Sequence, residues 1–187
     1  MKTKLTIFVL MLLALSSCSK SFKQIDVKTL KDNPVSLFAD DWMVVTAGTS
    51  TDYNLMTISW GALGNLWGYP TATIYVRDSR NTFTYMNRER YFTLCAFGEE
   101  CRDKLKVIGS KSGRDIDKVK ATGLTPLYTD LGNVYYKEAR LVLECEKVYF
   151  DDFAPNNFLD PAVVKIYNNE PSLHRVFVGK ILNVWVK

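Results

Sequence analysis

The feature that most constrains the fold of this chain is a series of short segments rich in β-branched and aromatic residues. Such residues are enriched in strands, and several of the segments alternate with a period of two. In the last segment Val176, Val178 and Lys180 face one way, whereas Phe177 and Gly179 face the other. The expected strands are 42–46, 55–60, 71–77, 91–97, 134–149 and 173–186.

A few helical segments interrupt the expected strands. Asp78 or Ser79 would cap the first helix, and Ser112 precedes the last in an S-x-x-D capping arrangement. The last helix would end before Gly123. Many strands with few helical insertions predict a mainly β fold that closes into a barrel. The expected helices are 80–87, 99–108 and 114–121.

The N-terminus has the pattern of a secretory signal. Lys2 and Lys4 precede an apolar run over residues 5–15, which is too short to span a bilayer as a stable helix. The run leads into Ser16, Ser17 and Cys18, an ending that resembles the lipobox of bacterial lipoprotein signal peptides. In that class the cysteine is acylated and becomes the mature N-terminus. The alternative is an ordinary signal peptide cut near Cys18, which would leave a soluble secreted protein.

Acylation of Cys18 would anchor the protein to a membrane of the cell envelope. Ser19 and the lack of a following acidic run favour the periplasmic side, by resemblance to lipoprotein sorting patterns. The lysine-rich segment after Cys18 is interpreted as a tether whose lysines could contact anionic headgroups. The expected organisation is a signal peptide over 1–17, a lipidated tether over 18–35 and one domain over 36–187.

Charge and cysteine usage narrow the function classes. Without the two lysines of the signal, 22 basic residues stand against 20 acidic ones, and they do not cluster as in a nucleic-acid-binding protein. The mature chain has no CxxC pair and one histidine, so no metal site is expected. Cys95, Cys101 and Cys145 are expected as buried thiols, or with one disulfide in which Cys95 and Cys101 are nearest in sequence.

Residues 54–120 combine aromatic rings, small residues and arginines, which suits a flat aromatic ligand that carries a phosphate. Arginine offers a planar fork of donors that matches phosphate oxygens. Arg77 and Arg80, with the hydroxyls of Ser79 and Thr82 beside them, could satisfy a dianion. From spacing alone, surface charges around a turn with Asp78 as a partner are the simpler interpretation.

Several motifs in order resemble the flavin reductase-like, FMN-binding split-barrel family. They are NLMTISWG, the R-x-x-R-x-T of Arg77, Arg80 and Thr82, the run SKSGRDIDK, and the closing HRVFVGKI. The resemblance covers about residues 38–186. It implies a six-stranded antiparallel Greek-key barrel, a homodimer, and FMN in a groove at or near the subunit interface. It also favours the phosphate-binding interpretation of the two arginines.

The resemblance further implies which residues contact the flavin. The strand backbone would hydrogen-bond the polar rim of the isoalloxazine, and a tryptophan would wall the ring or line the dimer contact. A half-buried strand with a core tryptophan is the alternative. Lys111 and Ser112 would lie near the flavin, although Ser112 is also explained as a helix cap. The residues assigned to the ring are Asn54, Met56, Thr57, Ile58, Ser59 and Trp60.

The implied activity is that of an FMN-dependent oxidoreductase. FMN would accept hydride from NAD(P)H, while the protein supplies binding, orientation and electrostatics. His174 would orient the nicotinamide, although a lone histidine on a strand is more often structural. A cell envelope holds little NAD(P)H, which keeps a second interpretation open: a flavoredoxin-like electron carrier that serves a redox protein. A third is a flavin-free binding module.

Overall fold

The computed structural model describes residues 21–167 and 172–187. The expected signal peptide and Cys18 lie outside this part of the chain. Eight described strands form one antiparallel sheet in the order β3-β2-β6-β9-β10-β5-β4, with β1 beside the far end of β10. They are β1 (Lys23–Ile25), β2 (Met43–Gly48), β3 (Tyr53–Ile58), β4 (Gly61–Leu66), β5 (Tyr69–Arg77), β6 (Tyr91–Ala96), β9 (Leu141–Asp152) and β10 (His174–Val186).

Strand β10 curls the sheet, because it pairs with two different strands along one edge. Its first half pairs with β5 and its last three residues pair with β1, while β9 runs along its other edge. Gly179 lies where the register between β9 and β10 shifts, and a Cβ there would meet the Phe92 ring at 2.5 Å. Glycine therefore lets β10 bend closely over Phe92.

The barrel is split, because β3 and β4 are the two ends of the strand order and do not pair with each other. This confirms the expected mainly β, antiparallel split-barrel fold, and it corrects the closure expected from strand composition. The sequence does not predict β4, whose residues GALGNL lack β-branched side chains. A two-residue turn joins β4 to β5, and Trp67 and Gly68 have φ of 53° and 81°, as a type I′ turn requires.

Two hydrophobic clusters lie on opposite faces of the sheet. The first fills the barrel interior, where Phe38 enters from helix α1 (Pro34–Ala39) and Met86 from helix α2 (Asn81–Arg88). The second lies between the outer face of the sheet and helix α3 (Arg102–Ser110), which contributes Leu105. Strand β3 serves both clusters, with Ile58 directed inward and Leu55 outward, in agreement with the predicted alternation.

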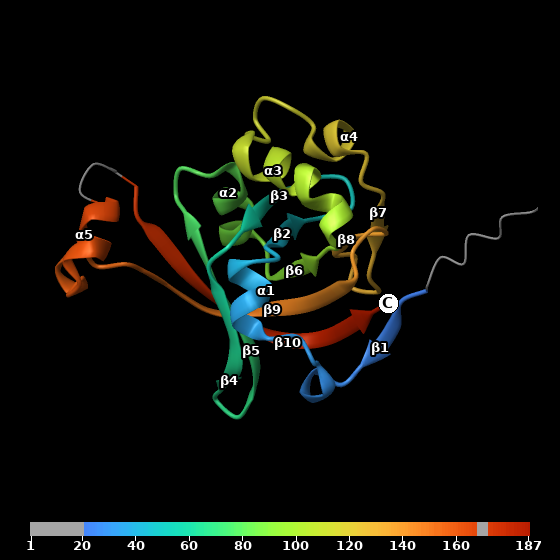
Figure 1. Cartoon of the computed structure of the whole chain (residues 1–187), viewed down its shortest axis with the longest axis horizontal. Coiled ribbons are helices and arrows are strands. Elements are labelled where there is room, and N and C mark those ends of the chain that lie inside the picture. Colours follow the sequence, from blue (N-terminus) through green and yellow to red (C-terminus); the bar gives the residue numbers. More distant parts are fainter. Residues whose placement is uncertain (1–20, 168–171) are drawn as a thin grey trace, which may run out of the picture.

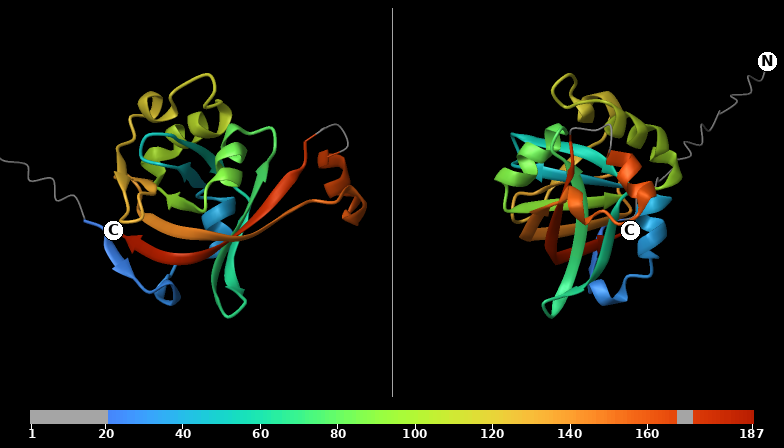
Figure 2. Two further views of the ribbon diagram at one scale, coloured as in Figure 1. Left: turned by 180° about the vertical axis from the view of Figure 1, so that it is seen from behind. Right: turned by 90° about the vertical axis from the view of Figure 1, so that its left-hand side faces the viewer.

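Three of the described helices gather at one end of the sheet. In Figure 1, α2, α3 and α4 lie together at the top, the β4–β5 hairpin projects at the bottom, and α5 lies apart at the ends of β9 and β10. Figure 2 shows the same separation from behind. The described helical segments are η1 (Val27–Thr29), α1 (Pro34–Ala39), α2 (Asn81–Arg88), η2 (Glu99–Cys101), α3 (Arg102–Ser110), α4 (Lys118–Thr122), η3 (Pro155–Asn157) and α5 (Pro161–Tyr167). A small second sheet pairs β7 (Pro126–Tyr128) with β8 (Val134–Tyr136).

The predicted helices exist, but two of them begin elsewhere. Helix α2 has Arg80 at its N-cap without a side-chain capping bond, so neither Asp78 nor Ser79 caps it. Helix α4 begins only at Lys118, where the Asp117 carboxylate accepts a hydrogen bond from the backbone of the third residue of the helix. The expected strand over residues 134–149 is divided into β8 and β9.

Part of the expected tether lies on the barrel. Strand β1 pairs with β10, and Ile25, Val27 and Leu30 pack against the interior cluster. Asn33 caps α1 through its side chain, and Pro34 occupies the first turn of that helix. The ordered contacts of the domain therefore begin before residue 35.

The three described cysteines are buried free thiols. Burial raises the pKa of Cys95 to about 12 and the pKa of Cys145 further still. Within the described residues no cluster of metal-ligating side chains occurs. None of the described helices is long and apolar enough to cross a membrane.

Candidate functional site

Two pockets lie on either side of the turn that joins β5 to α2. The first, called the edge pocket, has a volume of about 250 Å³ and lies between the second half of β3, the link to β4, and the neighbouring ends of β5 and β10. The second, called the anion pocket, measures about 130 Å³ and lies between this turn and the loop after α3. The edge pocket is lined by Met56, Thr57, Ile58, Ser59, Trp60, Tyr75, Arg77 and His174. The anion pocket is lined by Ser79, Arg80, Asn81, Thr82, Ser110, Lys111, Ser112, Gly113, Arg114 and Lys118.

The free edge of β3 supplies backbone groups to the edge pocket. The Leu55 carbonyl accepts a hydrogen bond from Lys118 Nζ at 2.9 Å and so points away from β2. Backbone groups of alternate residues point the same way in an antiparallel strand, so those of Thr57 also face the free edge. Thr57 Oγ1 donates to the Leu105 carbonyl at 2.7 Å, and Gly109 permits this approach because a Cβ there would already be 3.2 Å from Thr57.

Aromatic side chains form the far wall of the edge pocket. Trp60 is 43% exposed, and its ring centre lies 4.8 Å from that of His174. His174 is buried, with Nδ1 2.8 Å from the Tyr167 hydroxyl. Burial first, and then the charge of Arg77, lower the pKa of His174 to about 4. The imidazole is therefore neutral at pH 7.

The sequence predicts that Arg77 and Arg80 bind the same phosphate. In the structure Arg77 lines the edge pocket, whereas Arg80 lines the anion pocket. Arg77 pairs with His174 across β5 and β10, and its guanidinium carbon lies 5.8 Å from the centre of the Tyr167 ring. Arg80 donates through Nη2 to the carbonyl of Gly109 at the end of α3. Burial and the neighbouring charge of Arg77 lower the pKa of Arg80, which remains a cation.

The loop after α3 closes the anion pocket. Ser112 Oγ accepts a hydrogen bond from the Arg114 backbone at 3.1 Å, so this serine fixes a turn and does not cap α4. Arg114 Nη1 donates to the Ser79 carbonyl at 3.4 Å, which joins the loop to the turn before α2. Lys111 is exposed at the rim of the pocket.

Gly113 sits directly over two buried polar side chains. A Cβ at this position would lie 2.1 Å from Asn54 Oδ1, so a larger residue would displace either the loop or the Asn54 side chain. Asn54 Nδ2 in turn donates to Thr82 Oγ1 at 2.8 Å. The structure therefore places the Asn54 and Thr82 side chains beneath the loop, where they support it.

Lys118 is a residue that sequence reasoning missed. Its side chain is only 4% exposed and lines the anion pocket, and Nζ donates to the carbonyls of Leu55 and Ile108 at 2.9 and 2.8 Å. The run SKSGRDIDK contains it, but a lysine in the middle of the helix predicted over 114–121 gives no sign of burial.

The lining of the anion pocket fits a phosphate group. Four cationic side chains line it, together with serine hydroxyls, and no carboxylate is among the described residues that line it. Charged donors of this kind make the strongest hydrogen bonds to phosphate oxygens. The edge pocket offers flat aromatic walls and a row of backbone groups, which fits a planar heterocycle.

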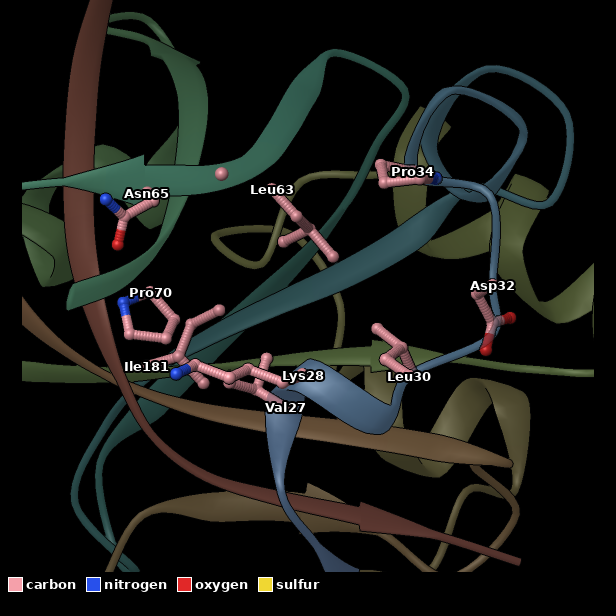
Figure 3. Close-up of a pocket in the computed structure, with 10 residues that line it drawn as sticks. Val27, Lys28, Leu30, Asp32, Pro34, Leu63, Asn65, Pro70 and Ile181 are labelled. Carbon is pink, nitrogen blue, oxygen red and sulfur yellow. The ribbon is translucent and has the colours of Figure 1, made fainter. Parts of the chain in front are cut away.

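Two further pockets flank the site or lie apart from it. One of about 410 Å³, beside Trp42 and α3, shares Thr57 and Ser59 with the edge pocket and Ser110 with the anion pocket. Another, of about 260 Å³, lies between the N-terminal segment and the β4–β5 hairpin, and Figure 3 shows its apolar wall of Val27, Leu30, Leu63, Pro70 and Ile181. It shares no lining residue with the other pockets described here.

A split antiparallel barrel with a cationic pocket beside the free edge of β3 defines the split-barrel class of domain. Within that class the chain belongs to a family described as "Flavin reductase like domain", which its residues 35–187 match. No curated protein matches the chain.

Solved structures with this fold agree with the assignment. The flavoredoxin from Methanosarcina acetivorans is 22% identical with a TM-score of 0.63, over 79% of this chain and 68% of that one. An FMN-binding domain of a flavin reductases-like enzyme from Shewanella baltica is 13% identical with a TM-score of 0.66, over 90% and 78%. An NADH:FAD oxidoreductase from Streptomyces globisporus is 13% identical with a TM-score of 0.61, over 79% and 75%. At these identities the likeness shows the fold alone.

Proposed function

We propose that this protein is an FMN-dependent oxidoreductase. The observation that supports it best is the junction of a carboxylate-free cationic pocket with an aromatic pocket at one turn of the chain. A phosphate in the first pocket and an isoalloxazine in the second match the two ends of FMN. Proteins of similar fold include ones named as FMN-binding and as an NADH:FAD oxidoreductase.

The anion pocket would hold the phosphate through charge and geometry. Arg80 and Arg114 present guanidinium groups, and Ser110 and Ser112 present hydroxyls. Both guanidinium groups already donate to backbone carbonyls, which fixes their positions before a ligand arrives. Pre-positioned donors lose less conformational entropy on binding than mobile ones.

The edge pocket would orient the ring and exclude water from one face of it. The Thr57 backbone presents an N–H and a carbonyl at the free edge of β3, and Trp60 covers the opposite side. FMN when bound supplies a hydride acceptor at its N5 atom, and the protein contributes position and electrostatics.

His174 would act on the hydride donor by position. Because the imidazole is neutral, a hydrogen bond accepted by Nδ1 from the Tyr167 hydroxyl would leave a proton on Nε2. That N–H can donate to the amide oxygen of a nicotinamide from NAD(P)H. In this role His174 orients the donor and exchanges no proton with it.

The absorption spectrum of the purified protein tests this proposal. After incubation with FMN and gel filtration, bands of bound oxidised flavin should elute with the protein and bleach when NADPH or NADH is added. A protein peak without flavin, together with no change in FMN fluorescence at equilibrium, would contradict FMN binding.

A flavoredoxin-like electron carrier is the second candidate, because the edge pocket opens at the surface beside the partly exposed Trp60. A ring held there could exchange electrons with a docked redox protein. Proteins of similar fold include flavoredoxins. A carrier would bind FMN but lack steady-state oxidation of NAD(P)H, which separates the two candidates.

We also propose that the protein is a lipoprotein of the cell envelope that faces the periplasm. The support is the sequence from Lys2 to Cys18. Metabolic labelling with a radioactive fatty acid should mark the protein, and Cys18→Ser should abolish the label. Unchanged labelling in that variant would exclude Cys18 as the acylated residue.

A homodimer is the expected assembly, supported by an exposed aromatic surface. Trp67 and Tyr149 are 56% and 43% exposed, and their rings are 6.1 Å apart. Contiguous exposed apolar surface of this kind marks association sites. Light scattering should give twice the chain mass, and Trp67→Asp should reduce it to the monomer. A monomeric starting protein would exclude the dimer.

A further inference from the structure

Among the described residues Lys118 has no ion-pair partner, although it is almost completely buried. Its ammonium group donates two hydrogen bonds, both to backbone carbonyls, one on β3 and one near the end of α3. The charge that shifts its pKa is that of Arg80, which lowers it. An ammonium group has three hydrogens to donate, so one remains for a ligand.

A buried cation with this environment is costly for the protein. Buried charges are normally paired, because removal from water disfavours the charged form. Burial, together with the charge of Arg80, lowers the pKa of Lys118 to about 8. A hydrophobic residue of similar length would avoid the cost, so the position favours a function for the charge.

The anion pocket supplies that function, because the Lys118 side chain lines its wall. Arg80 approaches from the turn before α2, and Lys111 and Arg114 approach from the loop after α3. On its other side Lys118 lines a pocket of about 220 Å³ that also holds Asp52, Tyr53 and Asp117. Hydrogen bonds from Tyr85 and Arg88 lower the pKa of Asp52, and burial raises the pKa of Tyr53, so neither changes charge between pH 7 and 9.

We propose that Lys118 determines the specificity of the site for a flavin that carries a phosphate, by giving its third hydrogen and its charge to the phosphate dianion. This inference rests on the proposed binding of FMN and adds to it the residue that separates FMN from riboflavin. The two carbonyls hold the ammonium group in place, and the phosphate supplies the ion-pair partner that no described residue provides.

The proposal links FMN affinity to pH. A phosphate monoester is a dianion above about pH 7, because its second pKa is near 6. The ligand therefore does not titrate between pH 7 and 9, whereas free Lys118 loses its proton through about pH 8. A bound dianion favours the charged lysine, so the affinity is highest when Lys118 is protonated and falls as the pH rises through 8. We expect FMN affinity to weaken about tenfold from pH 7 to pH 9.

Flavin fluorescence titrations test this expectation. The dissociation constant is measured at pH 7, 8 and 9 for FMN and for riboflavin, with the purified protein and with Lys118→Met and Lys120→Met. Lys120 lies exposed on the same short helix and serves as the matched control. The starting protein and Lys120→Met should show the tenfold change for FMN and no change for riboflavin. Lys118→Met should lose both the pH dependence and at least tenfold of the preference for FMN over riboflavin.

A purely structural role for Lys118 would give a different result. Loss of its two carbonyl contacts alone would weaken both flavins equally and leave the pH profile of FMN unchanged, and that outcome would overturn the proposal. Failure of the starting protein to bind FMN at pH 7 would instead refute the proposed function.

If Lys118→Met does not fold, a second experiment uses the unaltered protein. Calorimetry in two different buffers at pH 8 measures how many protons the protein takes up when a flavin binds. FMN binding should take up about half a proton and riboflavin binding none; equal uptake overturns the proposal.

Discussion

The anion pocket is formed mainly by polar and charged side chains, whereas the edge pocket is formed by strand backbone and aromatic rings. The anion pocket depends on side chains from the turn before α2 and its first residues, from the end of α3, and from the loop that leads from α3 to α4. The edge pocket depends on the backbone of β3 and on rings from three separate segments. One region therefore recognises charge through replaceable side chains, whereas the other recognises shape through the sheet. Substitutions should separate the two, with riboflavin as the ligand that uses only the second.

The largest effect is expected from Arg80→Ala. Hydrogen bonds to charged groups contribute about 1.5–3 kcal/mol, so FMN affinity should fall roughly ten- to a hundredfold. Riboflavin affinity should change little, because Arg80 lines only the anion pocket. Arg90→Ala is the control, since its side chain is 70% exposed, pairs with Glu146 and lies outside both pockets. Equal losses for FMN and riboflavin would place the phosphate elsewhere.

Gly113→Ala should disturb the same pocket through the backbone. The added Cβ would overlap Asn54 Oδ1, so either the loop moves or the Asn54 side chain leaves its hydrogen bond to Thr82. Overpacking of this kind costs about 1–3 kcal/mol. FMN affinity should fall roughly tenfold and the melting temperature should drop. Gly64→Ala adds a Cβ that meets no atom within 4 Å and should change neither quantity. Unaltered FMN binding in Gly113→Ala would show that the loop position is not critical.

A smaller effect on the other pocket is expected from Trp60→Ala. Aromatic pairs contribute about 0.5–1.5 kcal/mol beyond burial, so affinity should fall two- to tenfold. The loss should be the same for FMN and riboflavin, because Trp60 lines only the edge pocket among the two. Tyr128→Ala removes an exposed ring outside both pockets and is the control. A selective loss of FMN alone would contradict the division between the pockets.

The smallest effect concerns pH and His174, the single histidine of the chain. Its folded pKa of about 4 lies below the unfolded value, so its contribution to stability is complete above about pH 6.5 and is lost as the pH falls toward 4. NMR of the imidazole should show one titration near pH 4 and none near 6.5. The rate of NAD(P)H oxidation should likewise show no transition near pH 6.5. A histidine that titrates at 6.5 would mean that the edge pocket is open to water.

The sequence predicted best those features that a short run of residues determines by itself. Strand β3 and the turn at Arg80 could be predicted, because an alternating strand and a charged turn are both visible in a few residues. The separation of Arg77 from Arg80 could not, since it depends on how β10 aligns His174 beside Arg77. Lys118 could not be predicted either, because its burial results from α3 and β3 meeting above it. Strand β4 could not be predicted from the sequence, because its pairing with β5, and not its own composition, makes it a strand.

The free edge of β3 has a consequence for the behaviour of the protein in concentrated solution. An unpaired strand edge is a template on which a second chain can add and begin an aggregate. Here Thr57 Oγ1 ties the strand to α3, and Lys118 Nζ occupies the Leu55 carbonyl. The contacts that shape the site therefore also block this edge to a passing strand, so the same side chains protect the protein against edge-to-edge self-association.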